Sequence, residues 1–270
     1  MARGSGNGSD DIAEALRALL RAGLDLGVTE AARRLVQLAP PGINRGDAME
    51  VDRILDAERV RELIESVRAD PSGLLQLVKE VWSRGGSKER KAAAHAVGHG
   101  LSRLAPHRSL GLVRELAAMA TTPKEAELVG EEAIAPLLEA NPPFFDRVKQ
   151  FLQENQPWIR RAAITGLVAY VARRRKFTAL ALEAVLLLAD RHEAEIRSLV
   201  KQALKELSAI DWKATARAIA EWAKQDPTGG RAKIAKQFAA SLAADARQEL
   251  QRLLFANLAR FVDATPVRGR

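Results

Sequence analysis

The residues best suited to chemistry in this chain are arginines and lysines that gather at the ends of predicted helices. A guanidinium group stays charged and binds phosphate with two parallel hydrogen bonds, so these groups favour a phosphate-rich partner. Arg160 and Arg161 occupy a first helical turn, where positive charge opposes the helix dipole and suggests a use beyond folding. The alternative is an ordinary solvated helix surface, the usual role of a charge run. The candidate phosphate-binding residues are Lys88, Arg90, Lys91, Arg160, Arg161, Arg173, Arg174, Arg175, Lys176, Arg197, Lys201 and Lys205.

Histidine and glutamate offer two further kinds of site. His95 and His99 are separated by one helical turn, a spacing that can bind a metal ion. Because the sequence shows no third ligand beside them, we expect ordinary histidines and no metal site. Glu127, with Glu131 and Glu132, forms an acidic helix start and turn, which by itself favours the helix dipole. As chemistry, Glu127 could stabilise an oxocarbenium ion or activate water.

The overall charge indicates a polyanionic partner. The 270 residues include 42 Lys and Arg against 34 Asp and Glu, which gives a net charge of +8. Nucleic acid and an anionic membrane surface both fit that balance. No cysteine is present, which excludes disulfides, thiolate zinc sites and cysteine nucleophiles. No apolar run reaches the ~18 residues that span a bilayer, and the N-terminus has no signal-peptide core. We therefore expect a cytoplasmic, nucleoid-associated protein.

Only helices are predicted, because no segment shows sustained period-2 alternation and aromatics make up only 4% of the chain. Residues 1–11 are interpreted as a disordered tail, and residues 12–265 as a single domain. A helical hairpin and a Pro- and Gly-containing loop fill residues 12–55, and repeats fill residues 56–265. Prolines and glycines separate the predicted helices. Their ranges are 56–68, 72–84, 87–104, 109–119, 123–140, 143–154, 157–174, 177–190, 193–207, 212–224, 229–242 and 245–262.

The spacing of these helices predicts a repeat architecture. Pairs begin near residues 72, 109, 143, 177 and 212, about every 34 to 37 residues, within the range of helical repeats. This number of short helices is too large for a four-helix bundle. Stacking the helices in pairs would bury their apolar faces. We expect an all-α fold, a right-handed α-solenoid of HEAT-like repeats, in which equivalent faces of successive repeats line one basic concave surface. Trp82, Trp158, Trp212 and Trp222 could stack on bases, but packing between repeats is the more usual role of such residues.

Several stretches, in consistent order over residues 36–207, resemble the AlkD-like DNA alkylation repair family. Leu77–Leu101 is similar to the family segment in which Leu-Trp precedes an Arg-containing helix start. The run from Trp158 to Ile164 resembles its Trp-x-x-Arg-x-x-Ile helix start, and Ile196–Leu207 resembles a later helix. Pro41-Gly42-Ile43 matches a loop before the repeats. The resemblance implies a C-shaped stack of HEAT-like repeats that holds duplex DNA, and glycosylase members that excise cationic alkylated purines with an aspartate and two tryptophans.

The chain departs from that family pattern at the catalytic positions. By apolar register Glu127 falls at the aspartate, although a slip of one residue would place Ala126 there. Pro123 and Gln202 fall at the two tryptophans, whereas Arg161 matches the DNA-contacting arginine. The resemblance therefore implies a retained binding half and a degraded catalytic half.

The leading hypothesis is a monomeric protein that holds duplex, alkylated or damaged DNA through phosphate contacts without excising bases. It predicts no cofactor, no metal and no membrane partner. No predicted strand precedes Gly98-His99-Gly100 or Gly229-Gly230, so neither stretch is a phosphate-binding loop for a nucleotide. The alternatives are an active alkylpurine DNA glycosylase that uses Glu127, and a protein-interaction scaffold, for which the fold is equally suited.

Overall fold

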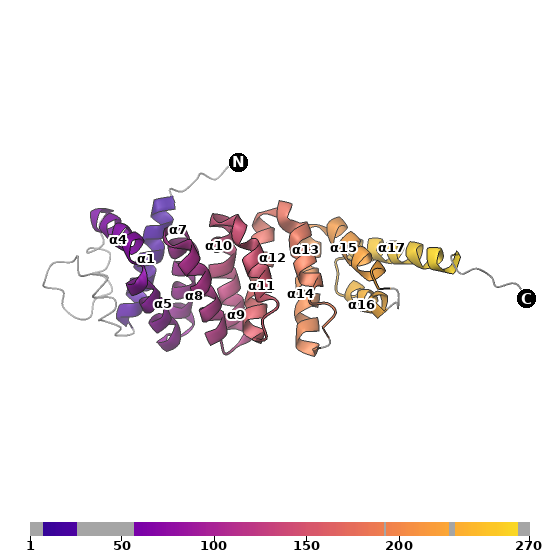
Figure 1. The fold of residues 1–270 in the computed structure, drawn as a ribbon, viewed down its shortest axis with the longest axis horizontal. Coiled ribbons are helices and arrows are strands. Elements are labelled where there is room, and N and C mark those ends of the chain that lie inside the picture. The colour runs from indigo at the N-terminus through magenta and orange to yellow at the C-terminus, as the bar shows by residue number, and fades with distance from the viewer. Residues whose placement is uncertain (1–7, 26–56, 192, 227–229, 264–270) are drawn as a thin grey trace, which may run out of the picture. The chain divides into compact units, whose positions relative to one another are not determined.

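The computed structural model describes residues 8–25, 57–191, 193–226 and 230–263, and no strand occurs within these ranges (Figure 1). The predicted all-α fold is confirmed. Two compact units make up the chain, and the boundary between them falls after Gly166, inside helix α12 (Pro157–Arg173). The second helix of the hairpin predicted in residues 12–55, and the loop that follows it, lie outside the described residues.

Short helices joined by brief connections make up the first unit. Helix α1 begins at Gly8, earlier than the start predicted at Ile12. The remaining bounds agree with the predicted ranges to within a few residues. The helices are α1 (Gly8–Asp25), α4 (Ala57–Ala69), α5 (Ser72–Arg84), α6 (Ser87–His95), η1 (Ala96–Leu101), α7 (Ser102–Leu104), α8 (Pro106–Met119), α9 (Pro123–Val129), η2 (Gly130–Ile134), α10 (Ala135–Ala140), η3 (Pro142–Phe144) and α11 (Phe145–Phe151).

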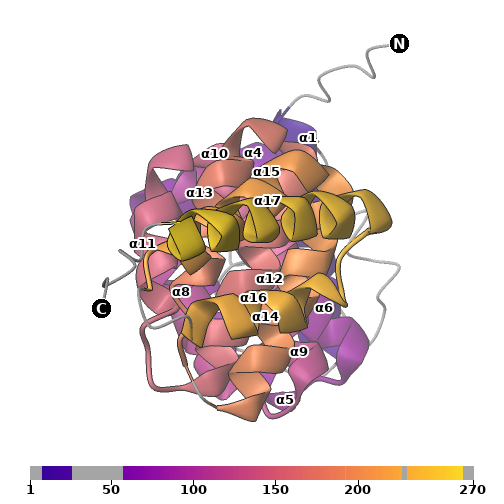
Figure 2. The ribbon, with the colours of Figure 1, turned by 90° about the vertical axis from the view of Figure 1, so that its right-hand side faces the viewer.

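The second unit continues the same pattern after α12. Helices α13 and α14 pack on each other and on α15, and α15, α16 and α17 form one packed group, which faces the viewer in Figure 2. The helices of this unit are η4 (Arg175–Phe177), α13 (Thr178–Leu186), α14 (Ala194–Ile210), α15 (Trp212–Lys224), α16 (Gly230–Ala239) and α17 (Ala244–Asp263). No described helix is long and apolar enough to cross a membrane.

Local sequence explains where several helices begin. Proline is the first residue of α8, α9 and α12, where its fixed φ suits the helix and its missing N–H costs nothing. The Thr122 hydroxyl caps α9 by accepting from the Glu125 backbone N–H at 3.3 Å. The Gln156 side chain caps α12 by accepting from the Trp158 N–H at 2.7 Å. These polar starts satisfy backbone donors that have no partner inside the helix.

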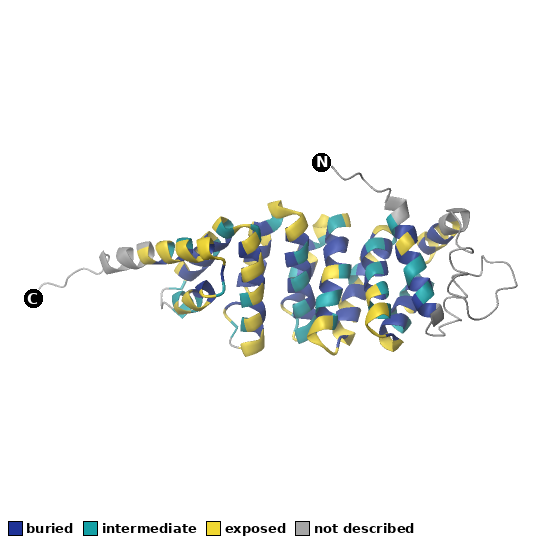
Figure 3. Ribbon diagram, turned by 180° about the vertical axis from the view of Figure 1, so that it is seen from behind, coloured by how far each residue is buried: buried dark blue, intermediate teal, exposed yellow. Residues whose placement is uncertain are grey.

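The helix pairs repeat at a nearly constant interval along the chain. Their first helices begin 34, 36, 33 and 37 residues apart, close to the predicted repeat, at Ser72, Pro106, Pro142, Arg175 and Trp212. Most apolar residues of each unit are buried, and buried and exposed residues alternate along the helices (Figure 3). Helix α12 carries a stripe of apolar residues at helical spacing, and every member is at most 1% exposed: Ile159, Ala163, Leu167, Tyr170 and Val171. Stacked pairs with a continuous apolar interior are what a helical-repeat protein requires.

Candidate nucleic-acid interface

Three second helices of successive repeats carry the candidate residues of the first unit. They are the continuous helix 87–104 (α6, η1 and α7), the continuous helix 123–140 (α9, η2 and α10) and the start of α12. Helix 87–104 packs on helix 123–140 along both α6 and η1. Helix 123–140 in turn meets α12 at Gly130. Side chains from the three first turns therefore lie next to one another.

Glycines let these three helices approach closely. A Cβ on Gly130 would lie 2.7 Å from the carbonyl oxygen of Ala162 and 2.8 Å from the backbone nitrogen of Gly166, both on α12. A Cβ on Gly98 would overlap the carbonyl oxygen of Glu132 and lie 3.0 Å from the Cα of Ala133. In both places backbone meets backbone, so no side chain larger than hydrogen fits without separating the helices.

A wide π-helical turn interrupts each of the first two helices, and sequence periodicity did not predict either of them. The turns are η1 in helix 87–104 and η2 in helix 123–140. In η2 the N–H of Ala135 donates to the carbonyl of Gly130, five residues earlier. Such turns insert a residue into the α-helical register and are frequent at functional sites. Both lie where the polar side chains of the two helices meet.

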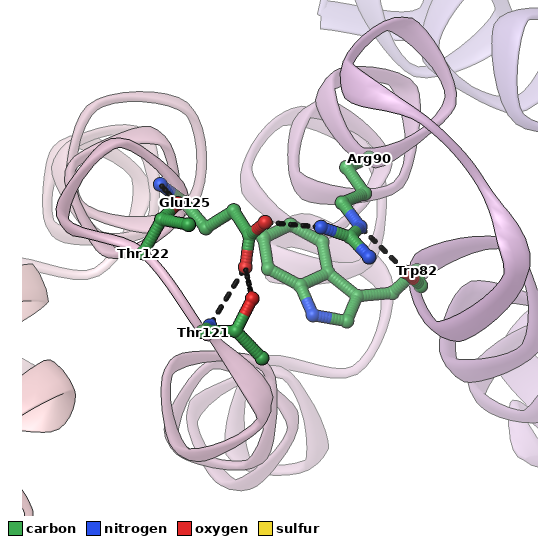
Figure 4. Close-up of polar contacts among 5 residues, drawn as sticks. All are labelled: Trp82, Arg90, Thr121, Thr122 and Glu125. Carbon is green, nitrogen blue, oxygen red and sulfur yellow. Dashed lines mark hydrogen bonds and ion pairs between the residues drawn. The ribbon is translucent and has the colours of Figure 1, made fainter.

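Arg90, on α6, forms the first of three polar contacts between these helices (Figure 4). Its guanidinium pairs with the carboxylate of Glu125, and its Nε donates to the carbonyl of Trp82 at 3.0 Å. The other Glu125 oxygen accepts from the backbone N–H of Thr121 at 2.7 Å and from its hydroxyl at 3.1 Å. Trp82 is itself buried, as expected for a packing residue. Arg90 therefore joins three helices, and any phosphate must compete with Glu125 for it.

The acidity of Glu125 reflects this network. Burial raises the pKa of its carboxyl, but the two hydrogen bonds from Thr121 and the charge of Arg90 outweigh that effect. The pKa of Glu125 therefore lies below its ordinary value, and the carboxylate is ionised at neutral pH.

Arg161 and Glu127 form the second contact. The Nη1 of Arg161 lies 3.0 Å from the Oε1 of Glu127, and the two side chains are 13% and 32% exposed. Ala126 is fully buried, so Glu127 is the residue that reaches the surface between helix 123–140 and α12.

Glu132 is the centre of the third contact. One of its carboxylate oxygens lies 3.2 Å from the Nζ of Lys91, and the other lies 3.1 Å from the Nδ1 of His95. The ring of His95 stacks on that of His99 with centroids 4.2 Å apart. The hydrogen bond from His95 is the largest cause that lowers the pKa of Glu132, to about 2, against the opposing effect of burial.

The other candidates of the first unit differ in how accessible they are. Lys88 is exposed and, among the described residues, takes part in no ion pair. Arg160 is only 9% exposed, and its Nη1 donates to the carbonyl of Glu154 at 3.1 Å. Its position indicates that it stabilises the start of α12 and does not reach out to a phosphate.

The candidates of the second unit lie on two segments. The first begins at the last residue of α12, and all its members are exposed: Arg173, Arg174, Arg175 and Lys176. The second lies on one face of α14, where Arg197 and Lys201 are half-buried and Lys205 is exposed. Within the described part of the chain, Arg174, Arg175, Lys201 and Lys205 form no ion pair.

Sequence reasoning missed the carboxylate partners of the predicted cations. The contacts join residues 35, 34 and 37 positions apart, one repeat length each: Arg90 with Glu125, Arg161 with Glu127, and His95 with Glu132. A search for opposite charges at the repeat spacing could have found them. The Thr-x-x-Glu pattern at Thr122 and Glu125, a known helix-start signature, also pointed to the first.

Comparison with protein families places residues 55–250 in the family described as DNA alkylation repair enzyme. The chain belongs to this family. The predicted resemblance is confirmed, and the family indicates a function related to DNA damage. A comparison with curated proteins gives no match.

The two residues that the resemblance predicts at the family's tryptophan positions lie on α9 and α14. Pro123 is exposed at the first position of α9. Gln202 is exposed on α14, where its side-chain amide donates to the carboxylate of Glu206 at 3.1 Å. Neither residue offers an aromatic face to a cationic base.

Proposed function

We propose that the protein binds duplex DNA that carries alkylation damage, through phosphate contacts, and does not excise the base. We further propose that its repeats form a right-handed, C-shaped solenoid with the phosphate-binding lysines and arginines on its concave side. The observation that carries the proposal is the ion pair between Arg161 and Glu127, at the two positions that the family resemblance assigns to DNA contact and catalysis.

Pairing with Arg161 works against a catalytic role for Glu127. A carboxylate stabilises a developing sugar cation through its negative charge, and a guanidinium 3.0 Å away offsets that charge. The aromatic faces that would stabilise a cationic base by cation–π attraction are replaced by Pro123 and Gln202. Both parts of the expected chemistry are therefore weakened at once.

Phosphate binding needs only accessible cations. The accessible lysines and arginines that form no ion pair among the described residues would supply most of the contacts: the exposed Lys88, Arg174, Arg175, Lys176 and Lys205, and the half-buried Lys201. Arg90, Lys91 and Arg161 would exchange a carboxylate partner for a phosphate. Contacts of this kind carry little sequence information, so we expect weak preference among duplex sequences.

A salt titration beside a base-release assay tests this proposal. By themselves, the six cations that form no ion pair within the described ranges predict a slope of about −5 in log K against log salt, or roughly a 10³-fold loss of affinity between 50 and 200 mM salt, and the three paired cations would make the slope steeper. We expect that slope on methylated duplex, with no free 7-methylguanine released. Release that disappears in Glu127→Gln would show an active glycosylase instead. Binding that is absent or insensitive to salt would favour a protein-interaction scaffold.

A further inference from the structure

His95, His99 and Glu132 form a compact group of potential metal ligands that neither the family nor the proposed DNA contacts explain. One nitrogen of each histidine and one carboxylate oxygen all lie within 4.8 Å of one another. The histidines lie on successive turns of helix 87–104, and the carboxylate comes from η2 on the neighbouring helix. The sequence predicts no metal here, because only the two histidines lie one turn apart on the same helix.

Gly98 explains why the third ligand arrives here. It lies between the two histidines in sequence, and its missing side chain lets the backbone of Glu132 and Ala133 pack directly against helix 87–104. A Cβ at this position would overlap the Glu132 carbonyl oxygen. The same close approach that brings the two helices together therefore carries the Glu132 carboxylate to the histidine rings.

We propose that His95, His99 and Glu132 bind a divalent transition-metal ion, with Zn²⁺ the best match. Two imidazoles and one carboxylate are a ligand set that zinc uses with a fourth position left to water. Tetrahedral bonds of about 2.0–2.1 Å place ligand atoms about 3.4 Å apart, so the present atoms need to close by roughly an ångström. Because the His95 and Glu132 side chains are 33% and 22% exposed, small rotations can achieve this and solvent can deliver the ion.

Lys91 completes the arrangement. It holds one oxygen of Glu132 at 3.2 Å, while the other oxygen faces His95. A metal that takes the second oxygen leaves the lysine contact intact, and an outer partner of this kind orients a ligating carboxylate.

Titration of the full-length, untagged and chelator-treated protein with ZnCl₂ in a calorimeter tests the site. We expect one ion per chain, a rise in melting temperature with zinc, and the ligand-field spectrum of tetrahedral cobalt when Co²⁺ replaces zinc. His99→Ala and Glu132→Gln should each weaken binding at least tenfold and remove that spectrum. His107→Ala, on an exposed histidine outside the group, should leave both unchanged.

The two ligand variants guard against a folding artefact, because they alter different helices. Circular dichroism in the absence of metal shows whether each is folded. Absence of binding by the parent protein, or binding that persists unchanged in both folded variants, would overturn the assignment. Metal binding is measured without DNA, so its failure would leave the DNA proposal standing.

Discussion

Replacing Gly130 by alanine should separate two helices that now touch through their backbones. The new Cβ would lie 2.7 Å from the Ala162 carbonyl oxygen and 2.8 Å from both the Gly166 nitrogen and the Thr165 Cβ. Ordinary contact begins at 3.4 Å, so α12 has to move by 3.4 minus 2.7, or about 0.7 Å. A gap of that size forfeits a quarter to a half of the dispersion energy of each stretched contact.

The expected cost follows from these contacts. Overpacking costs about 1–3 kcal/mol, and the upper end applies because none of the three opposing atoms belongs to a side-chain end that can rotate away. Because alanine has a higher helix propensity than glycine, the substitution also stabilises the helix by about 1 kcal/mol. Gly130→Ala should therefore destabilise the protein by about 2 kcal/mol, or lower its melting temperature by roughly 4–8 °C.

Gly111→Ala is the matched control. Gly111 also lies within a helix, α8, but it is exposed and a Cβ there would meet nothing within 4 Å. This variant should gain about 0.5–1 kcal/mol from reduced backbone entropy of the unfolded chain. Urea denaturation followed by circular dichroism measures both, with equal m-values as the check that the same surface unfolds. If the two variants shift stability in the same direction, the close packing at Gly130 is wrong.

Three further predictions address charge. Glu127→Gln should raise affinity for duplex DNA about three- to tenfold in fluorescence anisotropy, because one negative charge near the phosphates is removed; a fall in affinity would contradict the proposed contact. Arg174→Ala should reduce the salt slope by about 1, whereas Lys236→Ala, an exposed residue outside the candidate set, should not. Glu125→Gln should lose about 1–2 kcal/mol at pH 7. The pKa of Glu125 in the folded protein is lowered from 4.5. The parent's free energy of unfolding should therefore exceed that of the variant above pH 4.5, and the difference should shrink as pH falls below that value. A difference that persists in acid would show that ionisation of Glu125 is not its source.

The fold could be predicted from the sequence because its signals are local. Prolines at the starts of α8, α9 and α12 set the boundaries, and apolar spacing set the buried stripe of α12. The turns η1 and η2 could not be predicted this way. Each turn contains a glycine, Gly98 or Gly130, whose backbone lies against a neighbouring helix, and hydrophobic periodicity inside one helix carries no information about such contacts.

The sequence singled out the cations of the candidate site but not the carboxylates that pair with them. Arg161 stood out by residue type at a helix start, whereas its partner Glu127 was assigned a catalytic role through the family resemblance. Pairing between repeats is a tertiary fact, because it depends on which first turns lie side by side. The same limit hid Glu132, the third residue of the proposed metal group, from the two histidines on the neighbouring helix.

The carboxylates that pair with Arg90 and Arg161 reduce what these arginines gain by binding a phosphate. A half-buried arginine without a partner would carry a desolvation cost, and Glu125 and Glu127 reduce it in the free protein. A phosphate that approaches Arg90 or Arg161 must replace those contacts, so these residues gain less from binding than the exposed cations do. Affinity should therefore rest on the exposed set, while the paired arginines hold the helices in place. Variants of the two groups should differ accordingly: loss of an exposed cation weakens binding at unchanged stability, and loss of a paired arginine lowers stability first.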